Sequence, residues 1–180
     1  HLSMPGYREQ GLKQFQHPMP AKRQDSPYPH TPPKFGQKVH YAKDEDTSRP
    51  LDAGGQKHIQ RVNGKYLFLG RAVDSTLLVP LSTLASQQAK PTENTQARPE
   101  QFLDYVATQD DAILTYHASD MVLAIHNDAS YLSEPKARSS AGAHFFISSD
   151  RQMPSNNRPV LISCQFFRAV MSSGCEYEIG

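Results

Sequence analysis

The chain has 180 residues, and its 19 Lys and Arg against 18 Asp and Glu leave a formal charge of +1. The length suffices for one domain with a sizeable core or for two partial ones. The near-neutral charge excludes a strong global attraction to nucleic acid, so any such binding must come from local patches.

The two cysteines, Cys164 and Cys175, have no CxxC spacing and no paired histidine motif. This pattern argues against both a disulfide framework and a structural zinc site. The first residues carry no apolar stretch of the signal-peptide type, and no segment approaches the roughly 20 apolar residues of a membrane helix. We therefore expect an intracellular protein, cytoplasmic or nuclear, without membrane contact.

The first zone, residues 1–50, is predicted to be a proline-rich connector that holds eight of the 14 prolines. Proline lacks an N–H and biases the residue before it toward extended geometry, so most of this zone is not helical. A short helix over residues 7–16 is the exception. There, the residues that share one face are Tyr7, Gly11, Leu12 and Phe15.

The second zone, residues 51–110, carries helical periodicity. Two apolar runs with three- and four-residue steps predict two packed helices, with Asp74 and Ser75 as the capping signal between them. A third helix is expected over residues 101–108, with Pro99 in its first turn, where a missing N–H is tolerated. The residues of the two apolar runs are Ile59, Val62, Tyr66, Leu69, Leu77, Leu81, Leu84 and Ala85, and the third helix is expected to bury Phe102, Leu103 and Val106.

The third zone, residues 111–180, changes to the period of a strand. The expected strands cover residues 112–116, 121–129, 143–148 and 160–167, with turns at 134–136 and 154–157. The last three strands should form one antiparallel sheet. The predicted fold class is therefore α+β, with a helical segment followed by a partial antiparallel sheet.

Asp128 and Glu178 are the candidate catalytic and metal-binding residues. Two-metal phosphoryl hydrolysis needs carboxylates that converge on one point, because hard cations such as Mg²⁺ prefer oxygen ligands. Asp128 is expected to end its strand, on the face opposite Met121, Leu123 and Ile125, and Glu178 is expected in the first turn of a helix. Taken singly, a turn-forming Asp and a Glu that complements a helix dipole are the alternatives.

Residues 119–142 resemble the opening ribonuclease H segment of copia-type retrotransposon pol polyproteins. The shared pattern is an Asp-Ala step with a nearby aromatic residue, a short turn, a Lys/Arg-Ser step and a Gly-led strand. Residues 172–178 are similar to the Ser-Ser-x-x-Glu-x-Glu helix start in which the second Glu is a metal ligand. Residues 64–76 are similar to the helix and Arg-x-x-Asp step that follow the palm of these reverse transcriptases, and residues 2–7 to the strand and helix before it.

The resemblance implies that residues 51–110 are a thumb- or connection-like segment of a reverse transcriptase. Residues 111–180 would be the N-terminal half of a ribonuclease H-like domain, with Asp128 and Glu178 as catalytic ligands of Mg²⁺. The implied partners are an RNA–DNA hybrid or template–primer and the rest of the pol polyprotein.

The resemblance also places the polymerase aspartate pair before residue 1 and two later ribonuclease H carboxylates after residue 180. The parent would synthesise DNA from RNA and hydrolyse the RNA of hybrids, whereas this chain is expected to be a catalytically silent fragment. A non-catalytic nucleic-acid-binding or structural remnant is the alternative.

The sheet would lack the helices that cover it in a complete ribonuclease H domain. It is therefore expected to expose the apolar side chains of Phe145, Ile147 and Phe166.

Two other groups are weaker candidates. His126 projects to the same side of its strand as Asp128 and, with His117, can be drawn as a transition-metal site, although a solvated or core histidine is commoner. A phosphate-binding patch is the second candidate, and a solvated connector explains it equally well. Its cations are Lys13, Lys22 and Arg23, with Phe15 and Tyr28 nearby.

Overall fold

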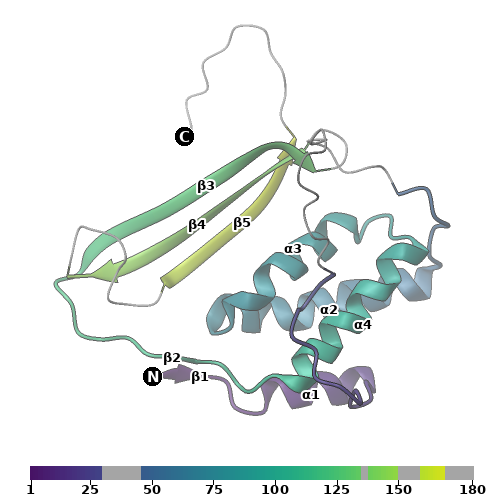
Figure 1. Ribbon diagram of the computed structural model, residues 1–180, viewed down its shortest axis with the longest axis horizontal. Coiled ribbons are helices and arrows are strands. Elements are labelled where there is room, and N and C mark those ends of the chain that lie inside the picture. The colour runs from purple at the N-terminus through teal and green to yellow at the C-terminus, as the bar shows by residue number, and fades with distance from the viewer. Residues whose placement is uncertain (30–45, 135–137, 150–158, 169–180) are drawn as a thin grey trace, which may run out of the picture.

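The computed structural model describes residues 1–29, 46–134, 138–149 and 159–168, and gives only the backbone for 130–134, 138, 140 and 159–168. These ranges hold four α-helices, a two-stranded sheet and a three-stranded sheet. Figure 1 shows the helices packed together on one side and the longer sheet as a separate layer that adjoins α3. The α+β class is confirmed.

Helix α1 spans Tyr7–Phe15, as predicted from its apolar face. It begins after Gly6, whose φ of 71° lies in the left-handed region that glycine adopts readily. Just beyond the helix, Nε2 of His17 lies 2.8 Å from Oδ1 of Asp104. This contact ties the end of α1 to helix α4, described below.

The two predicted central helices are present. Helix α2 spans Ala53–Ala72 and begins at Asp52, whose carboxylate accepts a hydrogen bond from the N–H of Gly55. A short 3-10 helix, η1 (Ser75–Leu77), leads into α3 (Leu78–Gln87). Asp74 caps η1 through the N–H of Thr76, which confirms the capping signal.

Helix α4 spans Glu93–Thr108 and is longer than predicted. Thr92 and Thr95 form a reciprocal capping box, and this box sets the start of the helix eight residues before position 101. The placement of Pro99 in the first turn is therefore wrong. Pro99 lies inside the helix, where it removes one main-chain hydrogen bond, and its buried ring joins the apolar packing.

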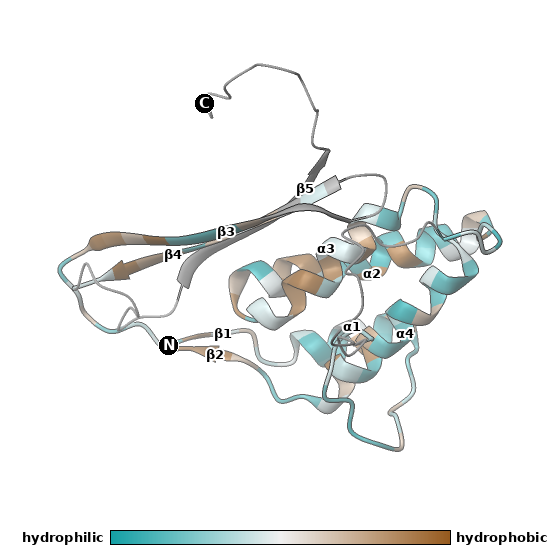
Figure 2. Cartoon of the chain, turned by 45° about the horizontal axis from the view of Figure 1, so that its top comes forward, coloured by the Kyte–Doolittle hydropathy of each residue, from teal (hydrophilic) through white to brown (hydrophobic). Residues whose placement is uncertain are grey.

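The hydrophobic core lies among α1, α2, η1, α3 and α4. Tyr66 is fully buried at its centre, and its ring meets that of Phe102 edge-on with centroids 5.4 Å apart. Burial raises the pKa of Tyr66 well above its usual value. The residues of the predicted apolar runs and of the third helix are at most 2% exposed, except Ala85, which is half-buried, so the periodicity is confirmed. In Figure 2, the brown colour of hydrophobic residues marks parts of α3.

The two short strands β1 (Leu2–Ser3) and β2 (Ile113–Leu114) pair antiparallel with each other. The strand predicted over 112–116 is therefore shorter than expected and does not belong to the main sheet. Its partner is the N-terminal segment, which brings the two ends of the helical region together (Figure 1).

The main sheet has the order β3-β4-β5 and is antiparallel throughout. Its strands are β3 (Val122–Glu134), β4 (Arg138–Ser148) and β5 (Pro159–Arg168). The prediction of one antiparallel sheet from these three segments is confirmed. The turns predicted at 134–136 and 154–157 fall wholly or mostly outside the described residues.

Exposed apolar side chains on the sheet belong to β3 rather than to β4. Leu123 and Ile125 are 58% and 52% exposed, whereas Phe145 and Ile147 are half-buried. The expected exposure was therefore placed on the wrong strand, because β4 is central and is flanked by neighbours on both sides. The side chain of Phe166 lies outside the described set. No described helix is long and apolar enough to cross a bilayer.

Candidate functional site

Asp128 lies within β3, with its backbone opposite Gly142 of β4. The side chain is exposed, and its Oδ1 accepts a 2.8 Å hydrogen bond from the N–H of Ala129. The expectation that Asp128 ends its strand is wrong, because β3 continues to Glu134. An exposed carboxylate on a sheet is nevertheless a suitable oxygen ligand for a hard cation.

Glu178 lies outside the described residues, so its approach to Asp128 stays a prediction. The described part of the chain contains no group of three or more His, Cys, Asp or Glu side chains that is arranged to hold a metal ion. Asp128, the described member of the predicted carboxylate pair, is exposed and lies opposite Gly142.

The sheet register brings an unpredicted histidine into the neighbourhood of Asp128. Unbroken pairing over residues 122–130 places His126 and Asp128 on one face, as the alternation predicted. The residue directly opposite His126 is His144 of β4. His117 lies outside these strands and does not join the other two in a three-ligand group. Finding His144 requires the register, which the sequence does not specify.

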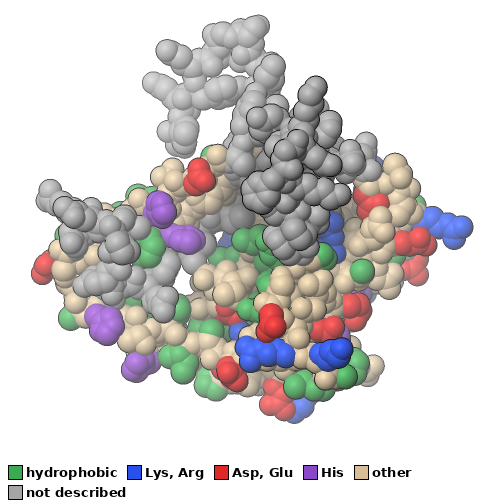
Figure 3. Space-filling model, viewed as in Figure 1, with side chains coloured by type: hydrophobic (Ala, Val, Ile, Leu, Met, Phe, Trp, Pro, Cys, Tyr) green, Lys and Arg blue, Asp and Glu red, His purple; other side chains and the backbone are tan. Residues whose placement is uncertain are grey.

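Helix α2 presents a row of cations that sequence reasoning missed. Lys57, Arg61 and Arg71 are exposed and lie on one face of the helix, together with Phe68, which is 60% exposed. Residues 53–73, which form α2 and its C-cap, include no Asp or Glu. The row spans about 21 Å at the rise of an α-helix. On the face shown in Figure 3, the Lys and Arg side chains lie over the helical half and the histidines over the sheet half.

Aromatic rings of α1 flank this row. The ammonium of Lys65 lies 3.9 Å from the ring centroid of Tyr7, and the guanidinium of Arg61 lies 5.8 Å from that of Phe15. The Tyr7 ring in turn lies 6.2 Å from that of Phe68. Such cation–π contacts hold the cationic stems in place without neutralising their charge. The signal available in the sequence was the recurrence of Lys57, Arg61, Phe68 and Arg71 at steps of four, seven and three residues, which keeps them on one face of a helix.

The cations predicted to contact phosphate are largely paired within the chain. Lys13 lies 2.6 Å from Glu9, and this hydrogen-bonded ion pair lowers the pKa of the Glu9 carboxyl. Arg23 lies 3.0 Å from Asp25. Lys22 is exposed. The N-terminal group therefore offers less free positive charge than the row on α2.

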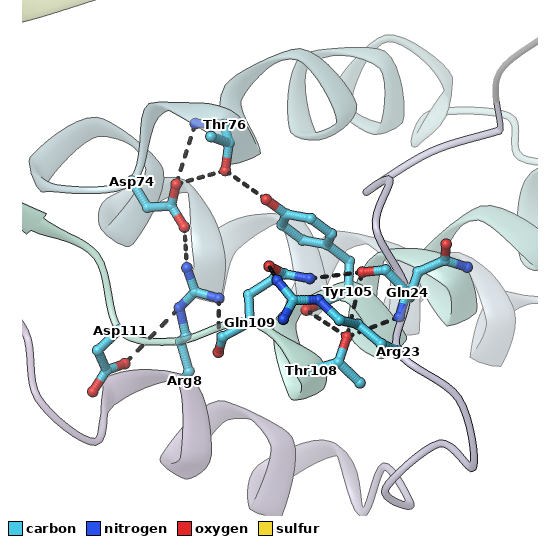
Figure 4. A network of polar contacts seen from close by, with 9 residues as sticks. All are labelled: Arg8, Arg23, Gln24, Asp74, Thr76, Tyr105, Thr108, Gln109 and Asp111. Carbon is cyan, nitrogen blue, oxygen red and sulfur yellow. Dashed lines mark hydrogen bonds and ion pairs between the residues drawn. The ribbon is translucent and has the colours of Figure 1, made fainter.

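A buried polar network fixes α1 against the rest of the helical region (Figure 4). Arg8 is 6% exposed and forms an ion pair with Asp74, which also caps η1. A second nitrogen of Arg8 donates to the carbonyl of Gln109, and its Nε lies 3.9 Å from Asp111. This network joins α1, the α2–η1 junction and the end of α4, and so positions the aromatic rings beside the α2 row.

Comparison with known proteins gives no assignment. No family model, no curated protein and no solved structure matches the chain. The functional conclusion therefore rests on the residues and their arrangement.

Proposed function

We propose that this chain is part of a copia-type retrotransposon pol polyprotein, from its reverse transcriptase into its ribonuclease H-like domain. Three kinds of observation support the proposal. The sequence resemblance runs in order through all three zones, the last three strands form an antiparallel sheet, and Asp128 is exposed on that sheet. The parent would copy RNA into DNA and hydrolyse the RNA of RNA–DNA hybrids.

Within this chain, the activity that the geometry supports best is binding of a nucleic-acid backbone by α2. The observation that carries it is the exposed row of Lys57, Arg61 and Arg71 on a helix without acidic residues. Lys57 and Arg61 lie about one helical turn apart and Arg71 nearly three turns further along the same face, so each can meet a different backbone phosphate, and Phe68 offers an apolar surface between Arg61 and Arg71. A purely structural remnant gives no reason for this concentration of exposed positive charge on one face.

The binding is expected to be electrostatic and dependent on salt. Each neutralised phosphate releases condensed counterions, so three contacts contribute on the order of 10²-fold to affinity at 0.1 M salt. Because the net charge of the chain is only +1, little long-range attraction adds to this local contribution. Moderate affinity without strong sequence preference follows.

The first test removes the α2 cations. Replacement of Lys57, Arg61 and Arg71 by Gln should weaken binding to a fluorescent RNA–DNA hybrid at least tenfold at 0.1 M salt, measured by anisotropy. Gln has a helix propensity similar to that of Lys and Arg, so α2 should keep its fold.

The matched control replaces Lys13, Lys22 and Arg23 by Gln, which removes the same charge elsewhere. We expect less than a threefold loss of affinity, because two of these cations are paired with acids. Equal losses in the two triple variants would show that the binding is diffuse, and unchanged binding in the α2 variant would contradict the proposed interface.

Asp128 and Glu178 would hold Mg²⁺ in the parent enzyme. When bound, Mg²⁺ would neutralise charge at the reacting phosphate. Two carboxylates are fewer than the roughly four that the resemblance assigns to the complete site. We therefore expect the purified 180-residue chain to release no RNA fragments from a hybrid in the presence of Mg²⁺. Cleavage that depends on Mg²⁺ and is lost in Asp128→Asn would show that the chain is catalytically active.

A further inference from the structure

We infer that His126 and His144 form a two-imidazole site for a borderline transition-metal ion such as Ni²⁺, Cu²⁺ or Zn²⁺. The site is separate from the proposed interface on α2. It also differs in chemistry from the carboxylate site, since imidazole nitrogen suits these ions whereas Mg²⁺ prefers oxygen.

The sheet register places the two histidines at a distance suited to chelation. They are direct partners in the β3–β4 ladder, within a stretch where pairing is unbroken from residue 122 to residue 130. Direct partners in an antiparallel pair project from the same face, with Cβ atoms about 4.5–5.5 Å apart. Both side chains are exposed, so an ion can reach them from solution.

The surroundings of His126 and His144 favour binding of a cation over contact with solvent alone. Phe146 packs edge-on against the His144 ring, with centroids 6.1 Å apart, and restricts its orientation. The sequence contains no Lys or Arg between Arg98 and Lys136, so β3 carries no positive charge to repel the ion. On the same face, Gly142 occupies the next position of β4 and leaves space beside the pair.

The site has two protein ligands. Asp128 is on the same face, but it does not form a three-ligand group with the two histidines in the described part of the chain. Water would complete the coordination. Such a site binds an ion more weakly than a closed structural site and would fasten β3 to β4 when occupied.

The test measures Ni²⁺ binding by calorimetry, with nickel chloride and an untagged full chain. The reference protein and all variants carry the substitutions His1→Ala, Cys164→Ser and Cys175→Ser, because a terminal histidine and thiols are competing ligands. We expect saturable binding of one ion per chain. His126→Ala and His144→Ala should each weaken it at least tenfold, because a single imidazole cannot chelate.

A control variant makes the assignment specific. His117→Ala, outside the β3–β4 pair, should leave the affinity within twofold. Thermal unfolding without metal should be alike in the histidine variants and their shared background, since the side chains of His117, His126 and His144 are exposed. Ni²⁺ should raise the melting temperature only where both His126 and His144 remain. Absence of saturable binding, or undiminished affinity in His126→Ala or His144→Ala, would overturn the inference.

Discussion

Arg8→Ala should lower the free energy of unfolding by about 3–5 kcal/mol, because it leaves the buried Asp74 without its counter-charge. The substitution also removes the donor to the Gln109 carbonyl, so the end of α4 loses a contact with α1. Urea unfolding followed by the far-ultraviolet circular dichroism of the helices would measure the loss.

Two further variants identify burial of the charge as the cause. Arg23→Ala removes a cation from an exposed ion pair with Asp25, and should cost at most about 1 kcal/mol. The double variant Arg8→Met/Asp74→Asn should recover part of the stability lost in Arg8→Ala, because no unpaired charge remains in the core. A loss in Arg8→Ala no larger than that in Arg23→Ala would contradict the role given to this network.

Gly11→Ala should destabilise the protein by about 1–3 kcal/mol, although alanine is the better helix former. A Cβ at position 11 would overlap the hydroxyl of Tyr66 and lie 2.7 Å from its Cζ. Tyr66 is fully buried between α1 and Phe102 and donates to the carbonyl of Arg8, so its ring cannot move aside without cost.

Gly64→Ala is the matched control within α2. Its added Cβ would meet nothing within 4 Å, so the helix propensity of alanine should appear as a gain of roughly 0.5–1 kcal/mol. Chemical denaturation of both variants measures the change in the free energy of unfolding, which should be a loss for Gly11→Ala and a gain for Gly64→Ala. Stabilisation by Gly11→Ala would mean that α1 does not pack on Tyr66 as described.

The helices were the most predictable part of the fold, because each buries a regular apolar stripe. The same reasoning misplaced the start of α4, since the capping box pairs Thr92 with Thr95 rather than with the commoner Glu or Gln. The full length of β3 was also missed. Residues 129–134 lack alternating apolar side chains. Residues 129, 130 and 134 pair with β4, and this tertiary contact is not encoded in local periodicity.

In the candidate sites too, some features follow from local sequence pattern and others depend on tertiary contacts. The sheet face of Asp128 follows from alternation alone, whereas His144 becomes its neighbour only through the register. The apolar stripe of α2 gave the helix, but the exposure of Lys57, Arg61 and Arg71 depends on which other elements cover α2. The N-terminal cations seemed equally suitable in sequence, and their pairing with Glu9 and Asp25 is visible only in the structure.

The salt dependence of hybrid binding tests the central claim most directly. The logarithm of the association constant is measured against the logarithm of the NaCl concentration for the unaltered chain and for the variant with Lys57, Arg61 and Arg71 replaced by Gln. If these side chains neutralise three phosphates, the slope of the variant should be shallower by about 2–3. Parallel lines for the two proteins would contradict the assignment of α2 as the nucleic-acid interface.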